Sequence, residues 1–204
     1  HASVDQVVQA GHTLLAVMPL NAGGGTPIVL TPKVSFSLLE EIYDYLQGIK
    51  PYGMTLEVVN PTYEFIKVKA SIGFVHGSDP GYYLKQLQQE LGTFISPWAG
   101  DLVHHNPFQI KLNPAMIMDF IKSRPYVESL GKGFAVYHFL QQGSHKEYIP
   151  VTGEYNNFQT QEPWGILTSV AQHQLRSLDG APFPPSQNLI GLVSATSSGK
   201  KVAK

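Results

Sequence analysis

The chain has no cysteine among its 204 residues. This absence excludes disulfides, thiolate zinc sites, iron–sulfur clusters and thiol nucleophiles together. Charged residues make up only 14%, and 14 Lys and Arg nearly balance 15 Asp and Glu. The resulting net charge of −1 gives no electrostatic reason to expect nucleic acid or an anionic membrane surface as a partner. No apolar run approaches the roughly 18 residues of a membrane span, so we expect no membrane insertion.

Apolar and turn-forming residues are plentiful instead. Hydrophobic residues reach 43%, with 19 Gly and 15 Pro. This composition predicts a globular protein with a sizeable core, and the low charge leaves a polar, aromatic surface that suits assembly with other proteins. The chain begins with His1 rather than Met, and we expect it to be a piece of a longer polypeptide.

Periodicity and capping signals predict a first α+β domain over residues 8–112. An apolar strand is expected at Thr13–Leu20, and the S-x-x-E pattern at Ser37 predicts a helix to Ile49. Strands are expected at 54–58 and 66–74, then a helix capped by Asp79 and Pro80 that runs to about Phe94. Strand, helix, strand, strand, helix matches most of the ferredoxin-like split βαβ plan. Phe108–Leu112 is the candidate for its last strand.

A second small α+β domain is expected over residues 113–180. Asn113 and Pro114 predict a helix that ends by Ser123, before Pro125. Phe134–Leu140 is apolar on both faces, which favours a strand sandwiched between layers, and Ile166–Val170 predicts a short strand. Residues 181–204 are rich in Pro, Ser, Gly and Lys, and we expect an extended or disordered tail.

No motif for catalysis, metal or cofactor stands out. The histidines are scattered, and adjacent His104 and His105 would leave an extended chain on opposite faces. Gly23–Thr26 lacks the lysine of a phosphate-binding loop. The acidic cluster Glu40, Glu41 and Asp44 is typical of a solvated helix face. We expect no enzyme and no cofactor, although a hydrolase site built from distant carboxylates such as Glu57 and Asp101 stays open.

Four aromatic residues are the candidate anchors or partner contacts. Trp98 and Trp164 are the only tryptophans, and each follows a proline. Each either anchors the core or offers a rigid packing surface to another subunit. Tyr155 and Phe158 lie in the unperiodic stretch before Trp164, and these three rings also allow an alternative function, a carbohydrate- or cell-surface-binding module.

The order of these features resembles the baseplate J-like family, the wedge proteins of contractile phage tails and contractile injection systems. The strings that carry the resemblance are Leu46 with Val58–Tyr63, the strand Ile66–Val75, Gly77, Tyr82-Tyr83, Phe94–Ala99, Asn113–Val127, Pro163–Val170 and Gln172–Gln174. The likeness covers roughly residues 8–178. Members of the family usually have a preceding N-terminal region that bridges to neighbouring wedge subunits, and nothing similar is seen here.

The resemblance implies a structural role without catalytic residues. It implies a wedge subunit that associates with other wedge subunits, hub and sheath proteins in a six-fold ring around a central hub. It also implies assembly in the cytoplasm and residence in a virion-like or released tail particle.

Overall fold

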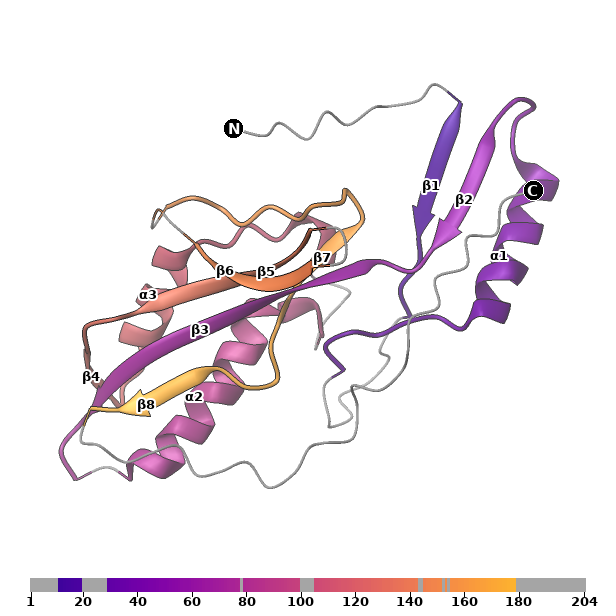
Figure 1. Ribbon diagram of the computed structural model, residues 1–204. Coiled ribbons are helices and arrows are strands. Elements are labelled where there is room, and N and C mark those ends of the chain that lie inside the picture. Colours follow the sequence, from indigo (N-terminus) through magenta and orange to yellow (C-terminus); the bar gives the residue numbers. More distant parts are fainter. Residues whose placement is uncertain are drawn as a thin grey trace.

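The computed structural model describes residues 11–19, 29–77, 79–99, 105–142, 145–151, 153 and 155–178. Helices and two separate sheets form a mixed architecture, which confirms the α+β class (Figure 1). The expected tail at 181–204 and the loop Gly23–Thr26 lie outside the described residues. Of the helices described, none combines the length and the hydrophobicity required to cross a bilayer.

The first part of the fold is a β1–α1–β2 unit. Strands β1 (His12–Ala16) and β2 (Thr55–Val59) pair in parallel, and helix α1 (Phe36–Ile49) connects them and packs on β2. The helix begins one residue after Ser35, whose hydroxyl accepts the Leu38 N–H at 3.4 Å. The cap is therefore Ser35, two residues before the expected Ser37.

The second part is a sheet organised around one long strand, β3 (Thr62–Phe74). Its other strands are β4 (Val127–Leu130), β5 (Ala135–Gln142), β6 (His145–Pro150), β7 (Gly165–Ser169) and β8 (Gln174–Ser177). The order is β4-β3-β5-β6, and β7 and β8 each pair with β3 in parallel. β3 thus contacts four strands from the second half of the chain.

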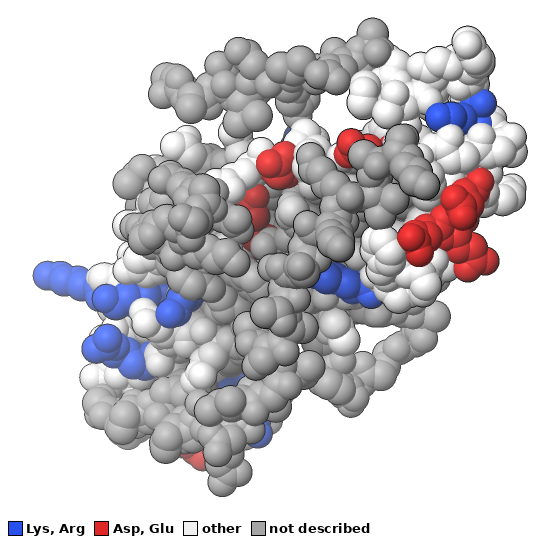
Figure 2. Space-filling model, turned by 45° about the vertical axis from the view of Figure 1, so that its right-hand side comes forward, with Lys and Arg blue, Asp and Glu red and all other residues white. Residues whose placement is uncertain are grey.

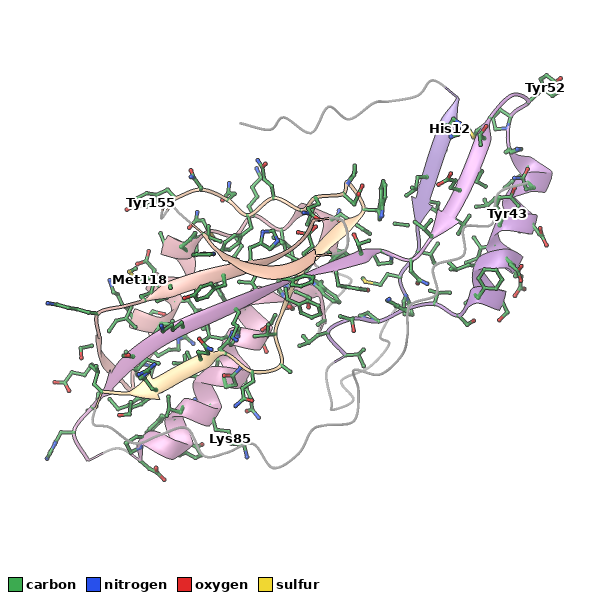
Figure 3. All side chains as sticks on the ribbon, viewed as in Figure 1. His12, Tyr43, Tyr52, Lys85, Met118 and Tyr155 are labelled. Atoms are coloured by element: carbon green, nitrogen blue, oxygen red, sulfur yellow. The ribbon has the colours of Figure 1, made fainter. Side chains whose placement is uncertain are left out.

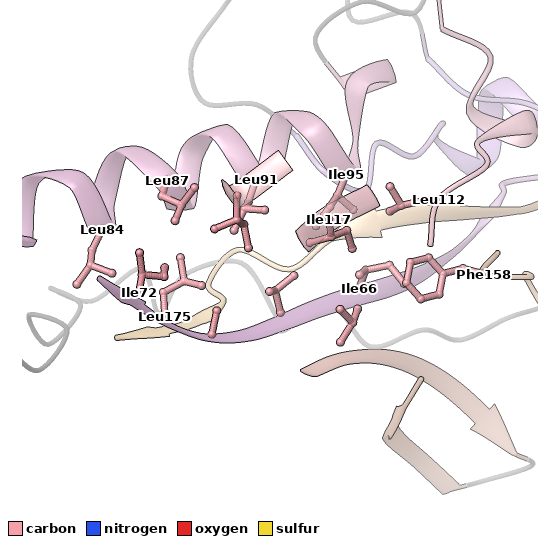
Figure 4. Packing of buried hydrophobic residues seen from close by; sticks show 14 of the residues in the cluster. Ile66, Ile72, Leu84, Leu87, Leu91, Ile95, Leu112, Ile117, Phe158 and Leu175 are labelled. Atoms are coloured by element: carbon pink, nitrogen blue, oxygen red, sulfur yellow. The ribbon is translucent and has the colours of Figure 1, made fainter. Parts of the chain in front are cut away.

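Helices α2 (Pro80–Ile95) and α3 (Pro114–Lys122) cover one face of this sheet. Asp79 and Asn113 cap them with their side-chain oxygens, and proline occupies the first turn of each, as predicted. In Figure 4, leucines of α2 point toward the buried side chains of β3. The residues labelled there belong to one buried apolar cluster: Ile66, Ile72, Leu84, Leu87, Leu91, Ile95, Leu112, Ile117, Phe158 and Leu175.

The sheet topology differs from the split βαβ plan. In that plan the two parallel strands leave room for a third between them, whereas β1 and β2 pair directly and β3 belongs to the other sheet. The expected closing strand at Phe108–Leu112 is also wrong. Pro107–Gln109 form a short 3₁₀ helix, η2, because the Asn106 side chain accepts the Phe108 N–H at 3.0 Å and caps the turn.

The large sheet joins residues from both sides of the expected domain boundary at 112/113. β3 belongs to the expected first domain, and all five of its sheet companions belong to the second. The strand predicted at Phe134–Leu140 is present as β5, but the described helices cover only one of its faces. β6 and β8 were not predicted, because each is short and lacks a strong alternating pattern.

Candidate functional site

The four aromatic candidates occupy different environments. Trp98 is fully buried and Phe158 is 7% exposed, whereas Tyr155 is 80% exposed and Trp164 is half-buried. Tyr155 points away from the large sheet in Figure 3. Only Tyr155 and Trp164 of the four have side chains that a partner can reach.

Trp98 fastens the end of α2 to strand β7. It lies in the 3₁₀ helix η1 (Pro97–Ala99), and its indole N–H donates to the Leu167 carbonyl at 3.2 Å. Its ring stacks against Tyr63 with centroids 6.0 Å apart and packs on Ile166. These contacts anchor the core and leave no indole surface for another subunit.

Phe158 holds the segment after β6 against the core. Its N–H donates to the Leu112 carbonyl at 2.8 Å, and its ring lies 6.0 Å from that of His138. The carbohydrate-binding alternative needed Tyr155, Phe158 and Trp164 as exposed rings, and the burial of Phe158 removes one of them.

A buried Ser169–His173 pair has the hydrogen-bond polarity of a structural contact. His173 Nδ1 accepts the Val68 N–H at 3.1 Å, so the ring proton is on Nε2, which donates to Ser169 Oγ at 3.1 Å. A general base would have to accept the serine proton instead. Burial, with Lys67 nearby, lowers the pKa of His173 to about 4 and keeps the ring neutral.

His173 fills a break in the sheet. Residues 62–66 of β3 pair with β7 and residues 69–72 pair with β8, so the Val68 N–H falls between the two ladders. The imidazole supplies the acceptor that this buried amide requires. The Ser169–His173 pair is therefore explained as a structural contact that satisfies the backbone N–H of Val68.

Glu64 and His138 form a second buried polar contact. His138 Nε2 lies 2.7 Å from Glu64 Oε2, and both side chains are 8% exposed. The other carboxylate oxygen accepts the Gln161 N–H at 2.7 Å. The contact joins β3 to β5 and holds the segment before β7, and its burial separates it from any substrate in solvent.

The described residues contain no group of three or more metal-ligating side chains. His104 and Asp101 lie outside the described residues, so the Glu57–Asp101 pairing has no structural account. An open cavity of about 390 Å³ lies between α3 and the β4–β5 turn, lined by Pro114, Met118, Lys122, Phe134, Val151 and their neighbours. Its lining offers one cation and otherwise apolar and backbone surface, which suits binding more than chemistry.

The outward face of α1 is a surface that the sequence reading missed. Leu38, Tyr45 and Ile49 are 44%, 70% and 64% exposed, while the neighbouring Leu39, Ile42 and Leu46 on the same side of the helix are half-buried. The helix therefore has one broad apolar face, of which a part stays exposed to solvent. In the sequence, Tyr45 beside the apolar residues at 38, 42 and 49 is the signal that this face is wider than one packed stripe.

A second surface is the face of the large sheet opposite α2 and α3, here called the open sheet face. It consists of Phe65, Lys67 and Lys69 of β3, Tyr137 and Phe139 of β5, and Arg176 of β8, which share a face by strand register. Neither α2 nor α3 covers it, and in Figure 1 both lie on the other side of β3. At its β7 edge, Trp98 of η1 and the Leu30 segment bury Ile166 and Thr168, which share this face by register. Aromatic residues and arginine are enriched in protein interfaces, and this face has Phe65, Tyr137, Phe139 and Arg176.

Comparisons with known proteins agree with an assembly role. Residues 3–133 match the family model described as "Baseplate protein PVC11-like". A search of curated proteins finds no match. A solved structure, the cryo-EM structure of the anti-feeding prophage (AFP) baseplate, 6-fold symmetrised, has a chain with a similar fold at TM-score 0.51 and 18% identity. The similarity covers 69% of this chain and 27% of that one, so this chain spans a minor part of that chain's length. Because the family model matches more than half of the residues, the chain belongs to the PVC11-like family of baseplate proteins.

Proposed function

We propose that this chain is a structural wedge component of the baseplate in a contractile, phage-tail-like injection particle. Family membership supports the baseplate role, and the resemblance to baseplate J-like proteins supports the wedge position. The protein acts through contacts with other wedge subunits, hub and sheath proteins in a six-fold ring. It assembles in the cytoplasm, becomes part of a virion-like or released particle, and uses no cofactor.

The observation that carries the proposal is the incomplete β1–α1–β2 unit. Two strands and one helix bury little apolar surface, and no residue of α1 is fully buried. A two-stranded sheet of this kind needs further packing for stability, and parallel strands are usually covered on both faces. Exposed Leu38, Tyr45 and Ile49 supply the apolar surface for that packing.

Recovery of the full-length protein with its particle tests the proposal. The tagged chain should sediment with intact particles from the source cells, together with hub and sheath proteins. Tyr45→Ser should reduce the incorporation of the chain into particles, because the substitution removes the ring between Leu38 and Ile49 on the exposed face of α1. Tyr82→Ser is the matched control, since Tyr82 is 62% exposed on α2, away from α1.

Two outcomes would contradict the proposal. One is a wild-type chain that never sediments with a particle. The other is a Tyr45→Ser chain that folds normally and is incorporated as well as the Tyr82→Ser control, which would remove α1 from the interface.

A further inference from the structure

We propose that the outward face of α1 in one copy of the chain packs on the open sheet face of a second copy. The inference rests on the proposed baseplate function and identifies a contact within it. The two surfaces lie on different parts of the same molecule. The exposed stripe of α1 lacks a described layer on top of it, and on the open sheet face Trp98 and the Leu30 segment cover only the edge at β7.

The two surfaces match in length. Helix α1 has 14 residues, which corresponds to about 21 Å at 1.5 Å per residue. The part of β3 from Phe65 to Ser71 extends for about 20 Å at 3.3 Å per residue. A helix laid on this face would give the sheet helices on both sides, a common layered arrangement.

The apolar groups also correspond. Leu38, Tyr45 and Ile49 are spaced by seven and four residues, so they form one stripe along the helix. The open sheet face presents the partly exposed rings of Phe65, Tyr137 and Phe139, and the rings of Phe65 and Phe139 meet edge to face at 6.2 Å. Contact between the stripe and these rings would bury apolar area on both copies.

The charges are complementary. The exposed carboxylates of α1 are Glu40, Glu41 and Asp44, and the open sheet face presents the half-buried Lys69 and the exposed Arg176. Figure 2 shows a group of acidic atoms on the side where α1 lies, with a smaller basic group above it, and several basic groups at the opposite end, with further acidic atoms between them. Such a distribution attracts the helix of one copy to the sheet of another and opposes helix-to-helix or sheet-to-sheet pairing.

The contact cannot form within one chain. β2 continues into β3 through Asn60 and Pro61, so the β1–α1–β2 unit projects from the start of β3 (Figure 1). In Figure 3 Tyr52 of this unit and Tyr155 of the large sheet lie at opposite ends of the molecule. When two identical copies meet through two different surfaces, one surface of each kind stays free. Further copies can then bind in the same way, and the assembly can close into a ring.

Sedimentation velocity on the full chain tests this with two variants. The helix variant is Tyr45→Ser/Ile49→Ser, and the sheet variant is Lys69→Glu/Arg176→Glu. The wild type should associate with rising concentration beyond the dimer, and each variant alone should associate at least about tenfold more weakly. An equimolar mixture of the two variants should form dimers and nothing larger. The sheet variant keeps an intact α1 stripe and the helix variant keeps an intact sheet face, so each pair can form only one contact.

Controls separate this contact from folding and from the proposed function. Tyr82→Ser should associate like the wild type, and Asp44→Lys replaces the helix variant if that variant melts early. A wild type that is monomeric up to about 0.1 mM, or a mixture that does not dimerise, overturns the inference. The wild type could also stay monomeric and still enter particles, while the helix variant does not enter them. That result would mean that α1 binds a different baseplate protein, and the proposed function would stand. A chain that associates with itself but never enters a particle supports the contact and contradicts the function.

Discussion

The side-chain amide of Asn60 forms hydrogen bonds with both backbone groups of Val34. Its Oδ1 accepts the Val34 N–H at 2.8 Å, and its Nδ2 donates to the Val34 carbonyl at 3.0 Å. Asn60 joins β2 to β3, and Val34 precedes α1. The amide therefore imitates a strand pairing at the place where the β1–α1–β2 unit meets the large sheet.

Replacement of Asn60 by alanine should loosen that junction. Val34 is buried, so its backbone groups would lose partners at a cost of about 1–3 kcal/mol. We expect faster amide hydrogen exchange in α1 and β2, with little change in the part of β3 that pairs with β5. Exchange that rises equally in both regions would show that the junction does not act locally.

The pH dependence of stability should follow His173. Its pKa falls from 6.5 in the unfolded chain to about 4 in the folded protein, so the unfolded chain binds the proton first as pH drops. The contribution of His173 to the free energy of unfolding is therefore complete above pH 6.5. As the pH falls from 6.5 to 4, the free energy of unfolding should drop by on the order of 3 kcal/mol. Urea titrations at several pH values measure it.

The variant His173→Gln gives the control for that titration. It should be less stable at pH 7 because it disturbs the acceptor for the Val68 N–H, yet its stability should depend less on pH between 6.5 and 4. An unchanged pH profile would assign the effect to another group.

The two tryptophans should differ in their effect on stability. Trp98→Ala should cost about 3–5 kcal/mol, because it opens a cavity and removes the hydrogen bond to Leu167. Trp164→Ala should cost clearly less, since the side chain is half-buried. Equal losses in urea denaturation would contradict the core-anchor role of Trp98.

The Glu64–His138 contact should show strong coupling. His138→Leu leaves a buried carboxylate without its imidazole partner, and we expect a loss of about 3–5 kcal/mol. Adding Glu64→Gln should recover much of that loss, since the amide keeps an acceptor for the Gln161 N–H and carries no charge. A double-mutant cycle from urea denaturation measures the coupling, and additive losses would show that the two side chains do not depend on each other.

Local features of the fold were predictable because their causes are local. Asp79-Pro80 and Asn113-Pro114 start helices at those positions, since a side-chain oxygen caps the first turn and proline suits it. The alternation from Ile66 to Phe74 likewise identified β3, although the strand begins at Thr62.

Pairings between distant residues were not predictable from one sequence. Nothing local distinguishes β1 paired with β2 from β1 separated by an intervening strand, so the sheet order had to come from the structure. The buried contact of Glu64 with His138 joins residues on two strands, and neither residue has a flanking motif. The capping of the Phe108 N–H by Asn106 overrode an apolar run that resembled a strand.

The position of β7 and β8 beside β3 has a consequence during synthesis of the chain. Residues 62–66 and 69–72 of β3 emerge from the ribosome long before residues 165–169 and 174–177, which complete one of its edges. Until then the nascent chain exposes unpaired backbone groups along an apolar strand, the kind of edge that recruits other chains. A messenger RNA that ends before the codons for β7 should therefore give a truncated protein that aggregates.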